Sequence, residues 1–199
     1  MSKSFNQVVE DRRSIYAIGK EQVLSAEQIQ EIVEHNVKHV PSPFNSQSAR
    51  TVILLGENHD KLWNIVRETL RKIVPAEFFA STDEKINSFQ NGYGTILYFE
   101  DQAVVEGLQA QFVKFKDNFP IWSLQSAGML QFAIWSTLEE AGLGASLQHY
   151  NPIIDDEVKE TWNLPKEWKL MAEMPFGKPL ADPGVKEFTP LDYRVKVFK

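Results

Sequence analysis

Three short stretches of the chain carry groups that can bind a small polar ligand. The first is DRRSIYAI near the N-terminus, in which Arg12 and Arg13 precede Ser14. Two guanidinium groups followed by a hydroxyl can neutralise a phosphate and donate hydrogen bonds to its oxygens. A solvated basic turn on an N-terminal helix explains the same residues, and this stretch alone leaves both interpretations open.

The second stretch, PSPFNSQSAR, spans residues 41–50 and carries no charge before Arg50. Its serine, asparagine and glutamine side chains suit contacts to a ribose, an amide or a ring edge, although a hydrogen-bonded connector needs the same residues. The third stretch, GLGASLQHYNP, spans residues 142–152. It can present backbone N–H groups to a ligand, or it can be an ordinary strand end.

Other chemical motifs are weak or absent in the sequence. His35 and His39 have the spacing of metal ligands on a helix, but no third ligand is suggested, so we expect a solvated helix face and no metal site. The carboxylate pairs Glu139–Glu140 and Asp155–Asp156 are each expected at a helix end, where charge is ordinary. No dinucleotide fingerprint, P-loop, GxSxG elbow or HExxH motif occurs, so we predict no catalytic side chain.

Composition narrows the class of protein. The chain has 199 residues, 43% of them hydrophobic, which predicts one folded domain. It has no cysteine, which excludes disulfides and thiolate chemistry, and its start lacks the apolar core of a secretory signal, so we expect a cytoplasmic protein. The net charge of −6 argues against broad binding to nucleic acid or to an anionic membrane.

Residues 118–138 contain no charged side chain and are long enough to span a bilayer. They also contain glutamines, serines and a proline, which are unfavourable in lipid. We therefore expect a helix buried on most sides within a globular protein or a dimer, and no membrane insertion.

The positions of helices and strands follow from periodicity and capping. Ser25 with Gln28 forms a capping box for a helix that Pro41 stops. We expect further helices over 62–73, 102–116 and 122–140, and strands over 51–56, 92–100, 144–150 and 167–177, with a last extended segment over 192–198. Helices and strands alternate, which indicates one α+β or mixed α/β domain, with a loose stretch at 177–188.

Taken together and in order, RRSIYAI, PSPFNSQSAR, WSLQSAGMLQFAIWSTLEEAGLGASLQHYNP, MPFGKP and PLDYRVKVF resemble the nitroreductase family of FMN-dependent oxidoreductases. The resemblance is greatest to the subgroup of the yeast fatty-acid-repression-mutant protein and its bacterial counterparts. It implies an α+β fold with a central, mostly antiparallel sheet flanked by helices. Residues 1–199 would form one FMN-binding domain with an extended C-terminal segment, in an intertwined homodimer with two FMN sites at the interface.

The resemblance also implies which residues hold FMN. Arg12 and Ser14 would bind its phosphate and ribityl chain, with Arg13 contributing through its backbone. The other subunit would supply Pro41, Ser42, Pro43 and Asn45, with Gln47 close by. The residues lying against the isoalloxazine would be Leu147, Gln148, His149 and Tyr150, one of whose backbone amides faces flavin N5. Lys186 would contact the phosphate, with Lys178 as the alternative.

The implied activity is hydride transfer from NADH or NADPH through FMN to a small aromatic acceptor, a nitroaromatic or a quinone, by a ping-pong mechanism. One position departs from the family: Tyr16 stands where many members have a lysine near flavin N1 and O2. We hypothesise that Arg67 or Arg71 supplies the missing positive charge. The alternative function is a flavin-binding regulatory or stress-response protein with little turnover.

Overall fold

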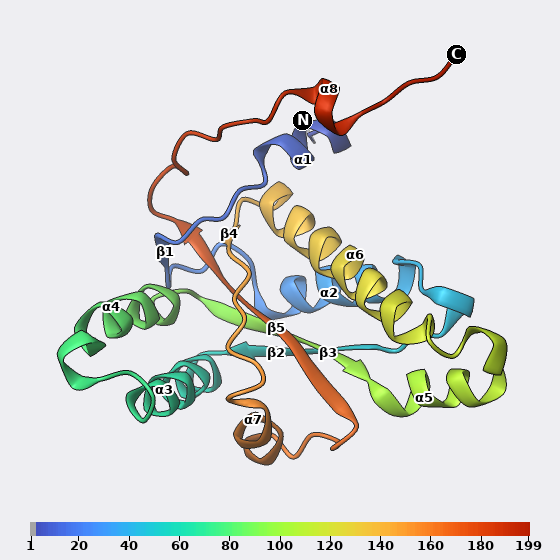
Figure 1. Cartoon of the computed structure of the whole chain (residues 1–199). Helices are drawn as coiled ribbons and strands as arrows, with labels where there is room; N and C mark the ends of the chain where they lie inside the picture. The colour runs from blue at the N-terminus through green and yellow to red at the C-terminus, as the bar shows by residue number, and fades with distance from the viewer. Residues whose placement is uncertain (1–2) are drawn as a thin grey trace.

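A five-stranded antiparallel sheet lies between two layers of helices in the computed structural model, which describes residues 3–199 (Figure 1). The strand order is β1-β5-β3-β2, and β4 also pairs with β5. The strands are β1 (Ile18–Gly19), β2 (Ala49–Leu55), β3 (Gly94–Asp101), β4 (Gly144–Ala145) and β5 (Trp168–Pro179). The expected antiparallel sheet flanked by helices is therefore confirmed.

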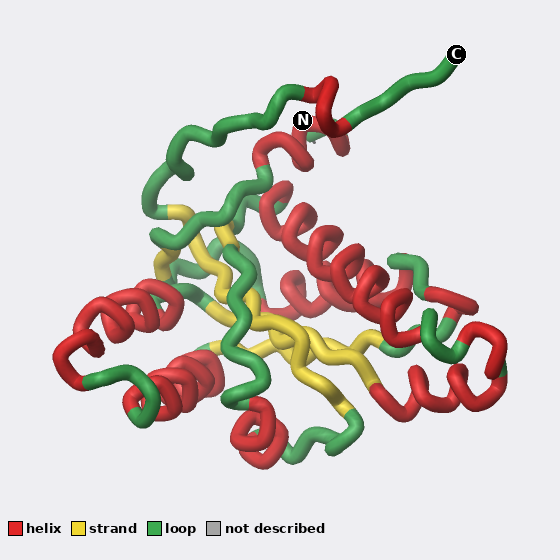
Figure 2. Tube along the Cα trace, in the orientation of Figure 1, coloured by secondary structure: helices red, strands yellow, loops and turns green. Residues whose placement is uncertain are grey.

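The α-helices are α1 (Phe5–Asp11), α2 (Ala26–His39), α3 (Glu57–Arg71), α4 (Phe79–Gln90), α5 (Gln102–Gln111), α6 (Phe119–Glu140), α7 (Asp155–Thr161) and α8 (Leu191–Arg194). Three 3-10 turns join them: η1 (Pro43–Asn45), η2 (Ala76–Phe78) and η3 (Val113–Phe115). Figure 2 shows helices on both sides of the strands and a C-terminal segment that is almost entirely loop after β5.

The capping box at the start of α2 is present as expected. The Ser25 hydroxyl accepts the N–H of Gln28 at 3.2 Å, and the Gln28 side-chain oxygen accepts the N–H of Ser25 at 2.9 Å. Both bonds satisfy donors that the first turn leaves without partners, so this helix begins where the sequence indicates.

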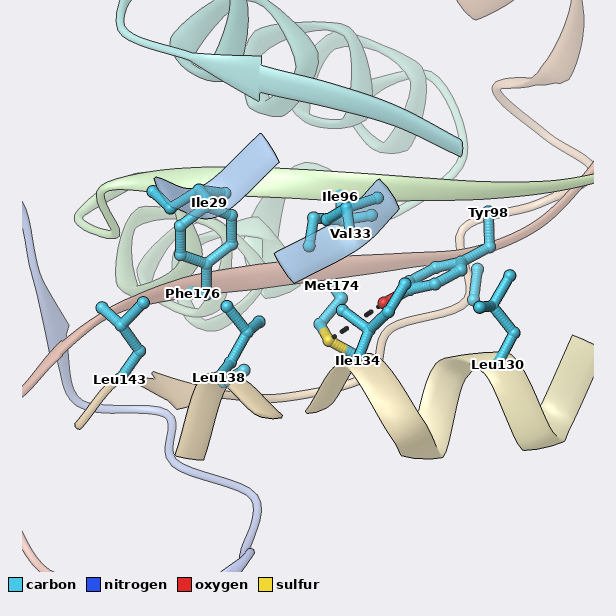
Figure 3. Close-up of a cluster of buried hydrophobic side chains, with 12 residues drawn as sticks. Ile29, Val33, Ile96, Tyr98, Leu130, Ile134, Leu138, Leu143, Met174 and Phe176 are labelled. Carbon is cyan, nitrogen blue, oxygen red and sulfur yellow. Dashed lines mark hydrogen bonds between the residues drawn. The ribbon is translucent and has the colours of Figure 1, made fainter. Parts of the chain in front are cut away.

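The sheet has a hydrophobic core on each face. On one face, α2 and α6 pack against β3 and β5, and Leu130, Ile134 and Leu138 of α6 point towards the sheet (Figure 3). On the other face, α3, α4 and α7 pack against Leu97 and Phe99. Successive residues of β3 enter opposite cores because side chains alternate along a strand, which explains why this strand is buried almost throughout.

Several expected boundaries were wrong. Helix α4 was not predicted, because only Phe79, Ile86 and Phe89 of its side chains are buried apolar groups. Only two residues of the expected strand 144–150 form a strand, and a single bridge at Gln148 continues the pairing. Residues 191–194 form a helical turn instead of an extended segment, closed by a bond from Val195 N–H to the carbonyl of Leu191. Helix α5 also ends earlier than expected, at Gln111, where η3 follows.

The uncharged stretch 118–138 is the body of α6. Ser123 and Ser126 are buried on the helix and hydrogen-bonded within the protein. Within residues 3–199, no helix combines the length and the apolar character that crossing a membrane requires.

Candidate functional site

The first and third of the stretches predicted to bind a ligand, DRRSIYAI and GLGASLQHYNP, lie side by side. Ser14 forms a bridge with Ala145, and the N–H of Ile15 donates to the carbonyl of Ala145 at 2.9 Å. The antiparallel pairing of β4 with Gly177 and Phe176 of β5 holds both at one end of the sheet. The fold thus joins two stretches that are far apart in the sequence.

Arg12 has an unusual environment for an arginine. Its guanidinium carbon lies 4.4 Å from the ring centroid of Trp135 and 5.7 Å from that of Phe132. Its buried Nε has no acceptor among the described residues, and burial, followed by the charge of Arg13, lowers the pKa of Arg12. A cation held against aromatic rings with a buried donor left over is suited to an anion that the chain does not supply.

Arg13 has a different role from its neighbour. Its Nη2 donates to the carbonyl of Gly184 at 2.8 Å, which holds the C-terminal segment beside Arg12. Lys186 follows two residues later, with its Nζ 5.3 Å from the ring centroid of Phe188. Lys178, the alternative phosphate contact, already forms an ion pair with Glu21 at 2.6 Å. These contacts favour Lys186, although its contact with phosphate is still a prediction.

Leu147–Tyr150 runs along β5 with its N–H groups pointing in alternate directions. Gln148 donates to the carbonyl of Glu173 at 2.7 Å and accepts from its N–H at 3.0 Å, while the N–H of Tyr150 donates to Glu173 Oε2 at 2.9 Å. The N–H groups of Leu147 and His149 have no acceptor among the described residues. This segment therefore presents two backbone donors on the side away from β5. The Tyr150 ring itself packs against Trp63 in the second core.

The wall formed by Pro41–Gln47 contains an unusual backbone. Phe44, Asn45 and Gln47 have φ angles of 54°, 52° and 49°. These lie in the left-handed region, which residues other than glycine seldom adopt. Ser42 Oγ accepts the N–H of Gln47 at 2.9 Å, and Arg50 Nη1 donates to the carbonyl of Gln47 at 2.7 Å. Strained residues held by several bonds are common at ligand sites, which supports the ligand interpretation of this stretch over that of a simple connector.

Sequence reasoning missed an aromatic cluster around this wall. Phe44 is 54% exposed yet lies 4.9 Å from Phe112, 5.4 Å from Phe119 and 6.2 Å from Trp122, between ring centroids. Phe115 also borders it. The unusual density of phenylalanine between residues 112 and 122 is the signal from which the cluster could have been found.

Phe44 of the wall and Arg12 lie near opposite ends of helix α6. Phe44 contacts Trp122 near the start of α6, whereas Arg12 contacts Trp135 near its end, about 20 Å further along at 1.5 Å per residue. Across the sheet, β2 begins opposite Glu100, whereas β4 pairs with the part of β5 that lies opposite Gly94. Figure 1 shows the same separation, with the light-blue loop before β2 on the right and β1 and β4 on the left. One chain alone does not bring Phe44 to Arg12, although Pro41, at the start of the same wall, lines a cavity with Phe132.

The two arginines proposed to replace the family's lysine lie on α3. Arg67 donates to Asp83 at 2.7 Å and to Gln90, whose neighbour Phe89 lies 6.2 Å from the ring of Tyr16. Arg71 lies one turn further along α3, with its guanidinium 4.3 Å from the ring centroid of Phe79. Arg67 therefore has a shorter chain of contacts to Tyr16 than Arg71 has. The positive charge of Arg67 is partly balanced by Asp83.

The rings of His35 and His39 on α2 lie 4.6 Å apart between centroids and are tilted by 46° to each other. Within residues 3–199, no group of three or more histidine, cysteine or acidic side chains is arranged to hold a metal ion.

Comparisons with known proteins relate the whole fold to one family. The model of the nitroreductase family matches residues 9–178. The HBN1 protein of Saccharomyces cerevisiae is 33% identical over 186 residues, which covers 92% of each chain. The solved structure of the nitroreductase CinD from Lactococcus lactis with chloramphenicol is 44% identical, covers 98% of this chain and 100% of that one, and has a TM-score of 0.91; CinD has also been solved with 4-nitrophenol. A protein from Exiguobacterium sibiricum in complex with FMN shares the fold at 14% identity, with a TM-score of 0.73 and coverage of 100% of this chain and 99% of that one.

Proposed function

This chain belongs to the nitroreductase family, and we propose that it is an FMN-dependent oxidoreductase that transfers hydride from NADH or NADPH to nitroaromatic or quinone-type acceptors. The observation that carries the proposal is the pairing of an Arg12 guanidinium that lacks an anion with two backbone donors on the segment beside it. The guanidinium suits a phosphate and the two N–H groups suit the edge of a flavin ring. The family match, together with the FMN bound by the Exiguobacterium sibiricum protein, supports FMN as the cofactor.

Within each subunit, Arg12 and Ser14 bind the phosphate and ribityl chain, and Lys186 adds a second cation for the phosphate. The N–H groups of Leu147 and His149 face the isoalloxazine ring, because those of Gln148 and Tyr150 are taken up by Glu173. Aromatic rings cover Arg12 and exclude water from it, so the attraction between its guanidinium and the phosphate is stronger here than in water.

The second wall of each site comes from a partner subunit, in a two-fold homodimer. The partner would supply Pro41, Ser42, Pro43, Asn45 and Gln47, because Phe44 in the middle of this wall lies at the Trp122 end of α6 whereas Arg12 lies at Trp135. Helix α6 exposes Ile121, Leu124, Met129 and Phe132, and the C-terminal segment exposes Val185, Phe188, Leu191, Tyr193, Val195, Val197 and Phe198. Exposed apolar surface of this extent favours subunits that wrap around each other.

FMN, when bound, supplies the redox chemistry by accepting a hydride and passing it on. The residues of the chain bind and orient the reactants, and none of them has to act as nucleophile or acid. Donor and acceptor use the same space in turn, which predicts ping-pong kinetics. Phe44 and its aromatic neighbours suit a small flat acceptor, and the binding of 4-nitrophenol and chloramphenicol by CinD favours that class of compound.

Tyr16 favours a second candidate, a flavin-binding regulatory protein with little turnover, because a neutral residue there stabilises the negative charge of a reduced flavin less than lysine does. Anaerobic mixing with NADH or NADPH distinguishes the two. An enzyme loses its yellow colour and regains it when a quinone is added. A yellow protein that neither nucleotide bleaches is the binding protein, and a colourless protein that takes up no FMN refutes both functions.

A further inference from the structure

Glu173 is a buried acid that the proposed chemistry does not use. It lies in the middle of β5 with 0% of its surface exposed, between the buried apolar residues Ala172 and Met174. Acidic side chains are seldom fully buried unless they are paired, so its presence here needs a reason.

The contacts of Glu173 are with Leu147–Tyr150, the segment proposed to face the flavin and called here the flavin-facing segment. The main chain of Glu173 makes two hydrogen bonds with Gln148, and its Oε2 accepts the N–H of Tyr150. Three bonds from one residue thus fix Leu147–Tyr150 along β5 and leave the N–H groups of Leu147 and His149 on the open side. Glu173 Oε1 is buried and has no partner among the described residues.

The surroundings make the proton on this carboxyl easy to gain or lose near neutral pH. Burial raises the pKa of Glu173 to about 8, opposed by the bond from Tyr150 and reinforced by Asp155 at the start of α7. Burial also raises the pKa of Asp155, and Lys159 and Lys169 oppose that rise. Burial also raises the pKa of Tyr150 to about 12 and lowers that of His59, so it favours the neutral form of both side chains.

We propose that Glu173 is the positioning residue of the Leu147–Tyr150 segment and that loss of its proton at alkaline pH adds to the pH dependence that the redox equilibrium of the bound flavin already has from its own proton uptake. The inference rests on the proposed function. Loss of the proton places a negative charge behind the segment, and a negative charge there opposes the arrival of electrons in front of it. A glutamine at position 173 can accept the same hydrogen bond from the N–H of Tyr150 but cannot ionise. The Glu173→Gln variant therefore distinguishes the effect of the negative charge from the effect of the hydrogen bond.

The test compares the FMN-loaded wild-type protein with Glu173→Gln. At a fixed electrode potential, the ratio of reduced to oxidised FMN is measured spectroscopically at pH 7 and pH 9. We expect this ratio to fall about fivefold further in the wild type than in Glu173→Gln, because an interaction worth one pKa unit is tenfold at its limit and is only partly expressed by pH 9. The matched control is Glu100→Gln, which alters another buried carboxyl, bonded to Ser48 and Ser123 and not to this segment. It should behave like the wild type.

The outcomes separate this inference from the function on which it rests. A wild-type protein that binds no FMN overturns both. A loaded protein whose Glu173→Gln variant follows the wild type, or whose Glu100→Gln variant loses the effect equally, overturns the inference alone. If Glu173→Gln does not fold, infrared spectra of the wild-type protein replace the comparison. A carboxylic-acid band that disappears around pH 8 and shifts on flavin reduction supports the proposal. A band that changes neither with pH nor with flavin reduction refutes it.

Discussion

Replacing Arg12 by methionine should affect FMN binding and the stability of the flavin-free protein in different ways. Methionine keeps an apolar chain over Trp135 but removes the charge and the donors. In the flavin-free protein the buried Nε without an acceptor costs about 1–3 kcal/mol, and stacking on the rings returns about 0.5–2 kcal/mol. The two effects nearly cancel, so we expect the free energy of unfolding to change by less than about 1 kcal/mol.

The effect on FMN should be much larger. Two charge-assisted hydrogen bonds to the phosphate contribute about 1.5–3 kcal/mol each, so their loss should raise the dissociation constant at least about 100-fold. Quenching of FMN fluorescence measures the binding, and urea unfolding of the flavin-free protein measures the stability.

Arg13→Met is the matched control, because it removes an equal charge from the next residue, whose side chain is bonded to Gly184. We expect about a tenfold loss of FMN affinity, clearly smaller than for Arg12→Met, because Arg13 acts only through a charge screened by salt and through its bond to the segment that carries Lys186. Equal losses in the two variants would refute the assignment of Arg12 as a direct phosphate ligand. So would an Arg12→Met protein that binds FMN normally.

Three further predictions follow from the same geometry. Asn45→Ala should weaken FMN retention about tenfold without changing the elution volume of the dimer in size-exclusion chromatography, and unchanged retention would return this stretch to a connector. Deleting residues 191–199, which removes exposed Leu191, Tyr193, Val195, Val197 and Phe198, should shift the protein towards monomer in sedimentation equilibrium, whereas an unaltered dimer would exclude wrapping by this segment. The raised pKa of Glu173 means that the folded state binds one proton more than the unfolded state between pH 4.5 and about 8, so stability should fall by on the order of 5 kcal/mol as pH rises through that window. Chemical unfolding at several pH values measures this fall, and Glu173→Gln should remove much of it.

The sequence predicted those parts of the fold that depend on local signals. The capping box at Ser25, the stop at Pro41 and the apolar spacing of α6 each specify an element without help from the rest of the chain. Helix α4 was not predicted because its few apolar side chains are too widely spaced to give a clear helical pattern among the polar residues. Packing against α3 stabilises this helix in the folded protein.

The stretches proposed to bind the ligand were recognisable by residue type, but their proposed roles depend on tertiary contacts. Nothing local indicates that Arg12 lies on Trp135, that Arg13 instead holds Gly184, or that Glu173 takes up alternate N–H groups of the flavin-facing segment. These contacts join residues more than twenty positions apart, so spacing within a motif carries no record of them. The resemblance of several motifs at once, rather than any single one, related the stretches to a flavin.

The central claim is that each FMN site combines Arg12 of one subunit with Asn45 of the other, and mixed dimers test it most directly. Arg12→Met and Asn45→Ala subunits, carrying different affinity tags, are refolded together, and the heterodimer is isolated and titrated with FMN. If the sites are shared, one site carries both substitutions and the other carries neither, so the heterodimer should bind one FMN with wild-type affinity while neither parent homodimer does. If each site lay within one subunit, every site would carry a substitution, and the absence of any wild-type site would contradict the account.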